Sequence, residues 1–531
     1  MNTDREKKER TKPTMSESHL DNRSVTAGNR RPSGLFDLGR KLFKWVSNSA
    51  FVVGLLSLVW FLVRTGTKPS RATYPCQRAA AAHGYLWLAA YIAPAFVRAR
   101  RRAHLSAVTP RDIVIVLAAV AVALLAWGLR NTDGKAALPA TADQTVRLNL
   151  VSQMAEIEPA SRLFAVNGTS GNDGGVDELI DVMGENGLLF YQSEHPGRNT
   201  GPTGLIASDD VVIIKVNGQW NERGGTNTDL LKEIIQELLD HPDGFSGEIV
   251  VADNGQAQYG STGKGGSFDY PRNNAEDASQ SVQSIVDSFS EEHHVSTYLW
   301  DTITTTRVSE YAEGESEDGY VMGETPDPTT GALVAYPKFR TAYGTFVSFK
   351  RGIWDPETEA YDVDRLKVLN VPVLKSHGIY GVTACVKHYM GVTSDKLTAR
   401  LGSRAHNTIC SGGMGTEMVQ TRFRMLNLLD AIWVNAIPRG GPRTGYRDAT
   451  QTNIIAASTD PVALDYWAAK YILIPAAQER GTTNVAAIDP DNTASRSSFG
   501  NWLRQSMAPI ADAGYQTTVN EAAISVTVST L

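Results

Sequence analysis

The sequence predicts an α/β protein with a mainly parallel sheet and flanking helices, preceded by an N-terminal helical transmembrane anchor. Three observations predict this architecture. Short apolar runs alternate with amphipathic segments beyond residue 160, which is the pattern of βαβ units. One of these runs, in residues 366–392, leads into the charged residues Lys375 and His377. Three further apolar segments lie before residue 130, and each approaches the ~20 residues that cross a bilayer.

The overall composition is that of a globular protein. The 531 residues are 42% hydrophobic and carry a formal net charge of −6, so no excess of positive charge argues for a nucleic-acid partner. The three cysteines, Cys76, Cys385 and Cys410, are widely spaced and form no CxxC pair. We therefore expect no cysteine-bound iron–sulfur cluster and no disulfide framework. Any other cofactor is left open.

The N-terminal part differs from the rest of the chain. Residues 1–45 are polar and basic and predict a disordered tail. Residues 46–130 predict a transmembrane anchor of about three helices, from apolar segments at 46–63, 79–97 and 113–129. Buried core helices or a cleaved signal peptide are the alternatives, but the first run begins late for a signal peptide and two more follow it. Lysines and arginines before the first segment and between the last two favour a cytoplasmic amino terminus. The large domain of this multi-pass membrane protein would then lie outside the cytoplasm.

The α/β domain is predicted over residues 149–531, after a linker at 131–148. Its clearest βαβ unit starts at 209–220, a continuous apolar run typical of a strand covered on both faces. An amphipathic helix with a Thr/Asn cap, an acidic first turn and a glycine stop follows. The next strand lies at 247–255, and a right-handed crossover would make the two strands parallel.

The remaining elements are predicted from the same signals. Residues 256–350 are rich in Gly, Ser, Thr and Asp and predict an insertion with one helix near 279–289 and short strands. Residues 366–392 predict a buried strand, a tight turn and a helix. A further helix is expected to begin at Pro461, because proline is favoured in the first turn. The C-terminal tail predicts one helix and the alternating strand AISVTVST.

Polar residues at the predicted strand ends form a candidate site. In open α/β sheets ligands bind beyond the carboxyl ends of the strands. Lysines there would neutralise a carboxylate or phosphate, while His377 with Asp253 or Asp430 would exchange protons or hold a metal. Any one of these residues could instead cap a strand end or be a solvated loop charge. The candidate catalytic residues are His377, Lys375, Asp253 and Asp430, and the candidate ligand-binding residues are Lys215, Asn217, Lys387, Arg439 and Arg443.

Lys387 and the arginine loop enter this set for separate reasons. Lys387 falls in an otherwise apolar predicted helix, so it needs an anionic partner or a lowered pKa if it is buried; otherwise it extends to the helix surface. The loop at 438–445 carries glycines and two arginines, which could cradle an anion, but it lacks the P-loop ending and the dinucleotide spacing. Whether a metal is present stays open, since no compact motif is formed by His377, His388 and His406.

The order of these segments resembles the domain-of-unknown-function 362 family. The resemblance spans roughly 209–474, is interrupted by the insertion at 256–350, and includes LNVPVLKSHGIYGVTACVKHYMGV and IIAASTDPVALDYWAAK. The resemblance implies a redox connection, because many members are fused to ferredoxin-like four-iron cluster modules. This sequence instead lacks the cysteine motifs and has an expected membrane anchor. The positions that match the family pattern are Lys215, Asn217, Asp253, Lys375, His377, Lys387, Asp430 and Asp460.

These observations favour an enzyme that acts on an anionic small molecule or a cell-envelope compound. A non-catalytic anion-binding or sensory module is the alternative, and an anchored redox-related protein is a further one. Asp460 has a structural alternative of its own, as the cap of the helix at Pro461. The sequence leaves open the substrate, the reaction, and whether the protein is an enzyme at all.

Overall fold

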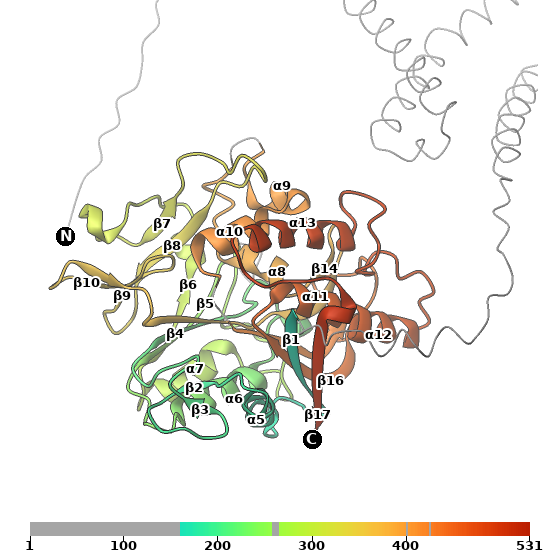
Figure 1. Cartoon of the computed structure of the whole chain (residues 1–531), viewed down its shortest axis with the longest axis horizontal. Helices are drawn as coiled ribbons and strands as arrows, with labels where there is room; N and C mark the ends of the chain where they lie inside the picture. Colours follow the sequence, from blue (N-terminus) through green and yellow to red (C-terminus); the bar gives the residue numbers. More distant parts are fainter. Residues whose placement is uncertain (1–159, 258–264, 400–401, 424–425) are drawn as a thin grey trace, which may run out of the picture. The chain divides into compact units, whose positions relative to one another are not determined.

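A ten-stranded sheet forms the centre of the computed structural model, which describes residues 160–257, 265–399, 402–423 and 426–531 (Figure 1). The order along the sheet is β17-β1-β16-β15-β12-β4-β5-β6, with β13 joined to β15 and β14 to β13. The predicted basic tail, anchor and linker fall outside the described residues. Within the described residues, every helix is too short or too polar to cross a membrane.

The strands that position the site run parallel. β4 pairs in parallel with both β12 and β5, and β6 continues the sheet beyond β5 in the same direction. Their carboxyl ends therefore meet at one edge, with Lys215 in register between Asn370 and Ala252. The bounds of the four strands are β4 Val211–Lys215, β5 Glu248–Asp253, β6 Val295–Leu299 and β12 Leu366–Asn370.

In the order β17-β1-β16-β15-β12-β4-β5-β6, the strand β16 alone runs opposite to the others. β16 is antiparallel to both β1 and β15, while β17 is parallel to β1 and β15 is parallel to β12. The predicted α/β class with a mostly parallel sheet is thus confirmed. The bounds are β1 Ser161–Asn167, β15 Leu426–Asn435, β16 Thr450–Ser458 and β17 Ile524–Thr530.

Helices cover both faces of the sheet (Figure 1). Alternate residues of β4 belong to different cores: Val212 and Ile214 pack with the α5–α6–α7 face, and Val211 and Ile213 pack with the opposite face. This two-sided burial explains why the strand is continuously apolar. The helices are α5 Gly175–Glu185, α6 Thr228–Leu239 and α7 Val282–Ser290 on one face, and α8 Cys385–His388, α10 Gly413–Thr421, α11 Pro461–Ala468 and α13 Phe499–Asp512 on the other.

Residues 256–350, predicted to be one insertion, contribute to two different sheets. Their first part supplies α7 and the sheet strand β6, as described above. Their second part begins a separate antiparallel sheet in the order β11-β10-β9-β8-β7, which extends beyond residue 350. Those strands are β7 Gly319–Met322, β8 Ala335–Arg340, β9 Phe346–Ser348, β10 Gly352–Asp355 and β11 Ala360–Asp362. The remaining short elements are β2 Tyr191–Gln192, β3 Thr200–Gly201, α9 Ala405–Thr408 and α12 Ile474–Glu479.

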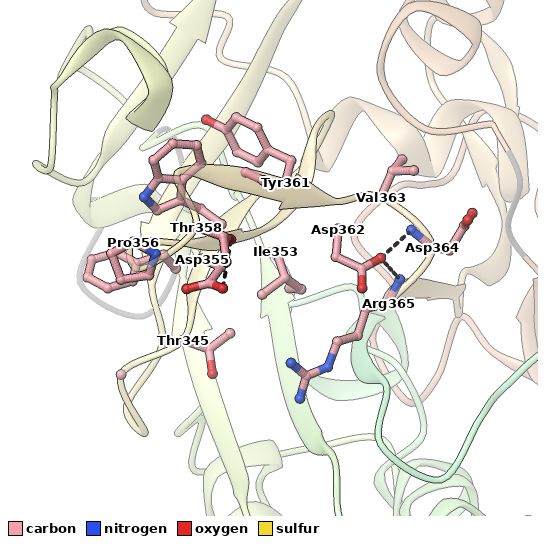
Figure 2. Close-up of a pocket in the computed structure, with 14 residues that line it drawn as sticks. Thr345, Ile353, Asp355, Pro356, Thr358, Tyr361, Asp362, Val363, Asp364 and Arg365 are labelled. Atoms are coloured by element: carbon pink, nitrogen blue, oxygen red, sulfur yellow. Dashed lines mark hydrogen bonds between the residues drawn. The ribbon is translucent and has the colours of Figure 1, made fainter.

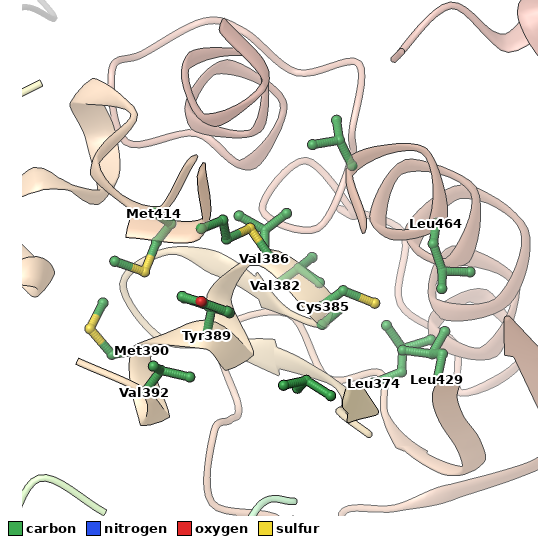
Figure 3. Close-up of a cluster of buried hydrophobic side chains, with 14 of the residues drawn as sticks. Leu374, Val382, Cys385, Val386, Tyr389, Met390, Val392, Met414, Leu429 and Leu464 are labelled. Carbon is green, nitrogen blue, oxygen red and sulfur yellow. The ribbon is translucent and has the colours of Figure 1, made fainter. Parts of the chain in front are cut away.

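The segment at 366–392 differs from the predicted strand, turn and helix. The strand is divided in two, because Pro372 offers no N–H to a sheet ladder: β12 ends at Asn370 and β13 Val373–His377 pairs with β15 instead. A short strand, β14 Gly381–Thr383, then folds back on β13. The helix α8 is a single turn, and its apolar side chains are fixed by tertiary packing around Tyr389 (Figure 3).

Candidate functional site

A pocket of about 510 Å³ lies at the carboxyl edge of the parallel strands. It is lined by residues at the ends of β4, β5 and β13 together with α8 and the turn that begins α9. Parallel pairing brings these distant segments together, as the strand-end argument predicts. The pocket gathers six of the nine predicted site residues: Lys215, Asn217, Asp253, Lys375, His377 and Lys387.

Lys215 and Asp253 form an ion pair at the base of the pocket. The Lys215 Nζ lies 2.8 Å from Asp253 Oδ1, and the two side chains are 2% and 3% exposed. The second oxygen of Asp253 accepts the N–H of Gly218 at 2.8 Å. Burial lowers the pKa of Lys215, and the Asp253 carboxylate opposes that shift. This lysine therefore has its counter-charge inside the protein.

Lys375 is buried without such a partner. Its Nζ donates a hydrogen bond to the carbonyl oxygen of Gly224, and among the described residues no carboxylate lies within ion-pair distance of it. Burial lowers the pKa of Lys375 to about 7, with Asp253 opposing this and the positive charges of Lys215 and Lys387 adding to it. Burial therefore brings the ionisation of this amine close to neutral pH.

Lys387 is the third buried lysine of the pocket. Its Nζ lies 5.3 Å from the centre of the Tyr380 ring, a cation–π contact. In the described part of the chain it has neither an ion pair nor a carbonyl acceptor for its N–H groups. Burial lowers the pKa of Lys387 to about 8, against the attraction of Asp395. Lys387 was expected either to be buried, with an anionic partner or a lowered pKa, or to extend to the helix surface. It is buried, and its pKa is lowered.

His377 is held as a neutral N–H donor. Its Nδ1 accepts the main-chain N–H groups of Ile379 and Tyr380, both at 3.1 Å. Burial, followed by the charge of Lys387, lowers the pKa of His377 to about 2. Since Nδ1 is an acceptor, the proton of the neutral ring is assigned to Nε2. No hydrogen bond within the described residues links His377 to Asp253, so the proton exchange expected between them has no direct route.

Asn217 lines the pocket and links two of its segments by hydrogen bonds. Its side-chain oxygen accepts the main-chain N–H of Val373 at 2.8 Å, and the main-chain N–H of Asn217 donates to Thr226 Oγ1 at 2.8 Å. These contacts join the end of β4 to the start of β13. The side-chain oxygen of Asn217 therefore helps to position the strand that carries Lys375 and His377.

Asp430 does not line the pocket. It stands in the middle of β15 instead of at a strand end, and it is fully buried. One oxygen accepts the N–H of Asn227, the cap of α6, at 2.8 Å, and the other accepts the N–H of Ile432 at 3.2 Å. Burial raises the pKa of Asp430 to about 6. The position within β15 corrects the expected strand end, and the contacts make Asp430 an anchor for α6.

The arginine loop contributes backbone rather than charge. Gly441 and Pro442 line the pocket, whereas Arg439 and Arg443 do not. The N–H of Gly441 donates to Ser376 Oγ at 3.0 Å, and its carbonyl accepts the N–H of Gly378 at 2.9 Å. The loop is thus tied to the end of β13.

Asp460 is the N-cap of α11. Its Oδ1 accepts the N–H groups of Val462 and Ala463 at 2.9 and 3.1 Å. It also accepts hydrogen bonds from Thr517 and Thr518, which fasten the C-terminal segment. These contacts agree with the alternative role considered for Asp460, that of a helix cap.

One cluster at the pocket was missed by the sequence argument. Asp395, which is fully buried, accepts hydrogen bonds from His406 Nδ1 at 2.7 Å and from Arg404 Nη2 at 2.8 Å, both at Oδ2. Burial would raise the pKa of Asp395, but the bonds from His406 and Arg404 hold it at about 2. Both His406 and Arg404 line the pocket. An aspartate eleven residues before a histidine forms no local motif, so only the tertiary structure reveals the pair.

In the described residues, no group of three or more His, Cys, Asp or Glu side chains is arranged to hold a metal ion.

A second pocket of about 730 Å³ lies at β10, β11 and Arg365 (Figure 2). Its carboxylates are engaged locally: Asp355 accepts from Thr358, and Asp362 accepts the N–H groups of Asp364 and Arg365. Of the cations predicted to form a site, Lys215, Lys375 and Lys387 line the first pocket, and none lines the second.

The fold and the first pocket define an α/β protein with a buried, lysine-rich pocket at the carboxyl edge of a mostly parallel sheet. Residues 357–470 match the model of a family described as a domain of unknown function (DUF362). The predicted resemblance to this family is confirmed over that segment, although the match begins later than the resemblance, which started near residue 209. No curated protein and no solved structure matches the chain.

Proposed function

We propose that the protein binds an anionic small molecule in the lysine-rich pocket. The observation that carries this proposal is that Lys375 and Lys387 are buried without a carboxylate partner among the described residues. A buried positive charge without a counter-charge is costly, and a bound carboxylate or phosphate would remove that cost. The pocket's volume of about 510 Å³ also falls in the usual range for small-molecule sites, about 300–1,000 Å³.

An enzymatic role is favoured over simple binding by the ionisation of the same groups. Burial brings the pKa of Lys375 to about 7 and that of Lys387 to about 8. Groups with pKa values near neutrality are suited to proton transfer and nucleophilic attack. An enzyme acting on an anionic small molecule or an envelope compound is therefore the first proposal, and a non-catalytic binding or sensory module is the alternative. A redox-related role gains no support from the contacts of the described residues.

Sulfate binding to the full chain tests the proposed pocket. Calorimetry should detect binding by the wild type and binding at least about tenfold weaker by Lys387→Met, since a hydrogen bond to a charged group contributes about 1.5–3 kcal/mol. Lys396→Met is the matched control, because Lys396 lies nearby in the sequence but is exposed. Equal affinities in the two variants, or no saturable binding by the wild type, would contradict the proposal.

We also propose that the apolar segments at 46–63, 79–97 and 113–129 anchor the protein in a membrane. The lysine and arginine bias favours a cytoplasmic amino terminus, with the α/β domain on the other side. The full chain should then sediment with membranes and remain there after an alkaline carbonate wash. A chain released by that wash would rule out the anchor, and protease added from the cytoplasmic face should leave the α/β domain intact.

A further inference from the structure

Three histidines line the pocket, His377, His388 and His406, and the surroundings of His377 and His406 fix opposite hydrogen-bonding roles. His377 presents an N–H, because its Nδ1 accepts two main-chain N–H groups. His406 is the reverse case, since its Nδ1 lies 2.7 Å from the ionised Asp395 carboxylate and therefore carries the proton. The Nε2 of a neutral His406 is left as a proton acceptor. An N–H donor and an acceptor thus line one pocket.

The His406 ring is held firmly in this orientation. The main-chain N–H of His406 donates to Asp395 Oδ1 at 3.2 Å, so the same carboxylate accepts hydrogen bonds from both the backbone and the ring of His406. Tyr380 donates its hydroxyl to the carbonyl oxygen of His406 at 2.8 Å. Asp395 is itself fixed by Arg404 and by its own N–H, which donates to Gln256 Oε1 at 2.7 Å. The ring nevertheless stays 29% exposed at the pocket.

The other charged groups around His406 favour an anion beside it. Lys387 and Arg404 line the same pocket, and Asp395 is the counter-charge of Arg404. Lys387 is the lysine whose N–H groups have no acceptor in the described residues, so it is available to a ligand. The titratable and charged groups that surround the ring are Asp395, Arg404, Lys387, His377 and Tyr380.

We propose that His406 is the proton-accepting catalytic residue of this pocket and that Asp395 is its positioning residue. The proposal rests on the proposed anion-binding function and names its chemistry: the substrate is a carboxylate- or phosphate-bearing small molecule with an acidic X–H group. In the step, the X–H bond breaks, its electron pair stays on X, and the proton forms a bond to His406 Nε2. Lys387 stabilises the negative charge left on X, and the His377 N–H donates a hydrogen bond to the substrate.

Sulfate is a suitable probe because it carries no titratable proton near neutral pH, so any proton taken up on binding goes to the protein. Calorimetry of the full chain in buffers of different ionisation enthalpy measures that uptake. The wild type should take up protons as sulfate binds, and His406→Gln should take up fewer, because only the uptake by Lys375 and Lys387 then remains. The exposed His195 provides the control His195→Gln, which should behave as the wild type. Undiminished uptake by His406→Gln would overturn the proposal.

A second measurement tests His406 in the absence of any ligand. Nitrogen-15 spectra of histidine-labelled full chain should assign the proton of neutral His406 to Nδ1 and that of His377 to Nε2. Asp395→Asn should change the His406 tautomer while leaving that of His377 unaltered, which a merely structural role of Asp395 does not predict. If the wild type fails to bind sulfate but shows these tautomers, the anion-binding function fails and the assignment of His406 stands. An Nε2 proton on His406 would overturn the assignment itself.

Discussion

Lys215 and Asp253 form a 2.8 Å ion pair between the ends of two adjacent parallel strands, and the pair is almost completely buried. Among the described residues, Lys215 is the one lysine of the pocket that has a carboxylate partner. Because the partner fixes this charge, Lys215 stabilises the pocket wall, while Lys375 and Lys387 remain free to meet a ligand. The same pair leads to the first two predictions.

Asp253→Asn should strongly destabilise the protein. Removing one member of a buried pair leaves the other charge unpaired, which costs about 3–5 kcal/mol. Denaturant unfolding of the full chain measures this loss, with Asp269→Asn, at an exposed aspartate, as the control. A change below about 1 kcal/mol would mean that the pair is not held as the structure places it.

Gly391→Ala should disturb the same pair by a steric route. A β-carbon at Gly391 would stand 2.2 Å from Asp253 Oδ1 and 2.4 Å from Lys215 Nζ. Both atoms are held by their mutual bond, so the new methyl group should force them apart and weaken sulfate binding as well as stability. Gly323→Ala is a comparison for the loss of stability, because the atom nearest to a β-carbon there is the Val334 carbonyl oxygen at 3.6 Å. Unchanged sulfate affinity in Gly391→Ala would count against the close approach.

Anion affinity should fall as the pH rises. The unliganded pKa of Lys375 is lowered to about 7 and that of Lys387 to about 8. Both amines are protonated below pH about 7 and lose their charge as the pH passes through these values, so sulfate should bind most tightly below pH about 7 and progressively more weakly above it. Calorimetry across this range checks the trend, and Lys387→Met should show a weaker dependence. A flat profile would exclude these lysines as the binding cations.

The lowered pKa of Lys375 also predicts the pH dependence of stability. Its folded pKa of about 7 lies below the ordinary value of 10.5, so between these values the unfolded chain binds more protons than the folded one. Stability contributed by this residue therefore rises with pH across that window. The difference in unfolding free energy between the wild type and Lys375→Met isolates the effect. A difference that stays constant with pH would show that Lys375 is not desolvated.

Asp460→Ala should destabilise the fold without altering the pocket. Loss of a helix N-cap costs about 0.5–2 kcal/mol, and here the carboxylate also holds the C-terminal segment through Thr517 and Thr518. Asp460→Asn should lose less, because an amide oxygen can still accept the cap bonds. Thermal or denaturant unfolding measures both variants. Sulfate affinity should equal that of the wild type, and a large loss of affinity would place Asp460 in the site.

Local patterns in the sequence were sufficient for the elements with strong periodicity. The continuous apolar run that became β4 predicted a strand covered on both faces, and helices do cover both faces there. The cap, the amphipathic spacing and the glycine stop predicted α6, which begins after its cap Asn227. Pro461 marked the first turn of α11. In each case the determining interactions lie within one turn or one strand, so the identities of neighbouring residues are enough to predict the element.

Part of the candidate site was also accessible from the sequence. Parallel strands end at a common edge, so the polar residues after β4, β5 and β13 had to meet there, and Lys215, Asp253, Lys375 and His377 do line one pocket. The roles of these residues were not accessible in the same way. Ion pairing of Lys215 and isolation of Lys375 depend on which side chains lie within a few ångströms, and that is a property of the packed sheet.

The sequence by itself determined the α/β class, the parallel core and the edge at which the polar strand ends collect. Tertiary structure alone decided that Asp430 anchors α6, that β13 leaves β12 to pair with β15, and that Asp395 orients His406. The physical reason is range. Periodicity and capping act between neighbouring residues, whereas proton positions and charge pairing depend on atoms that only folding brings into contact.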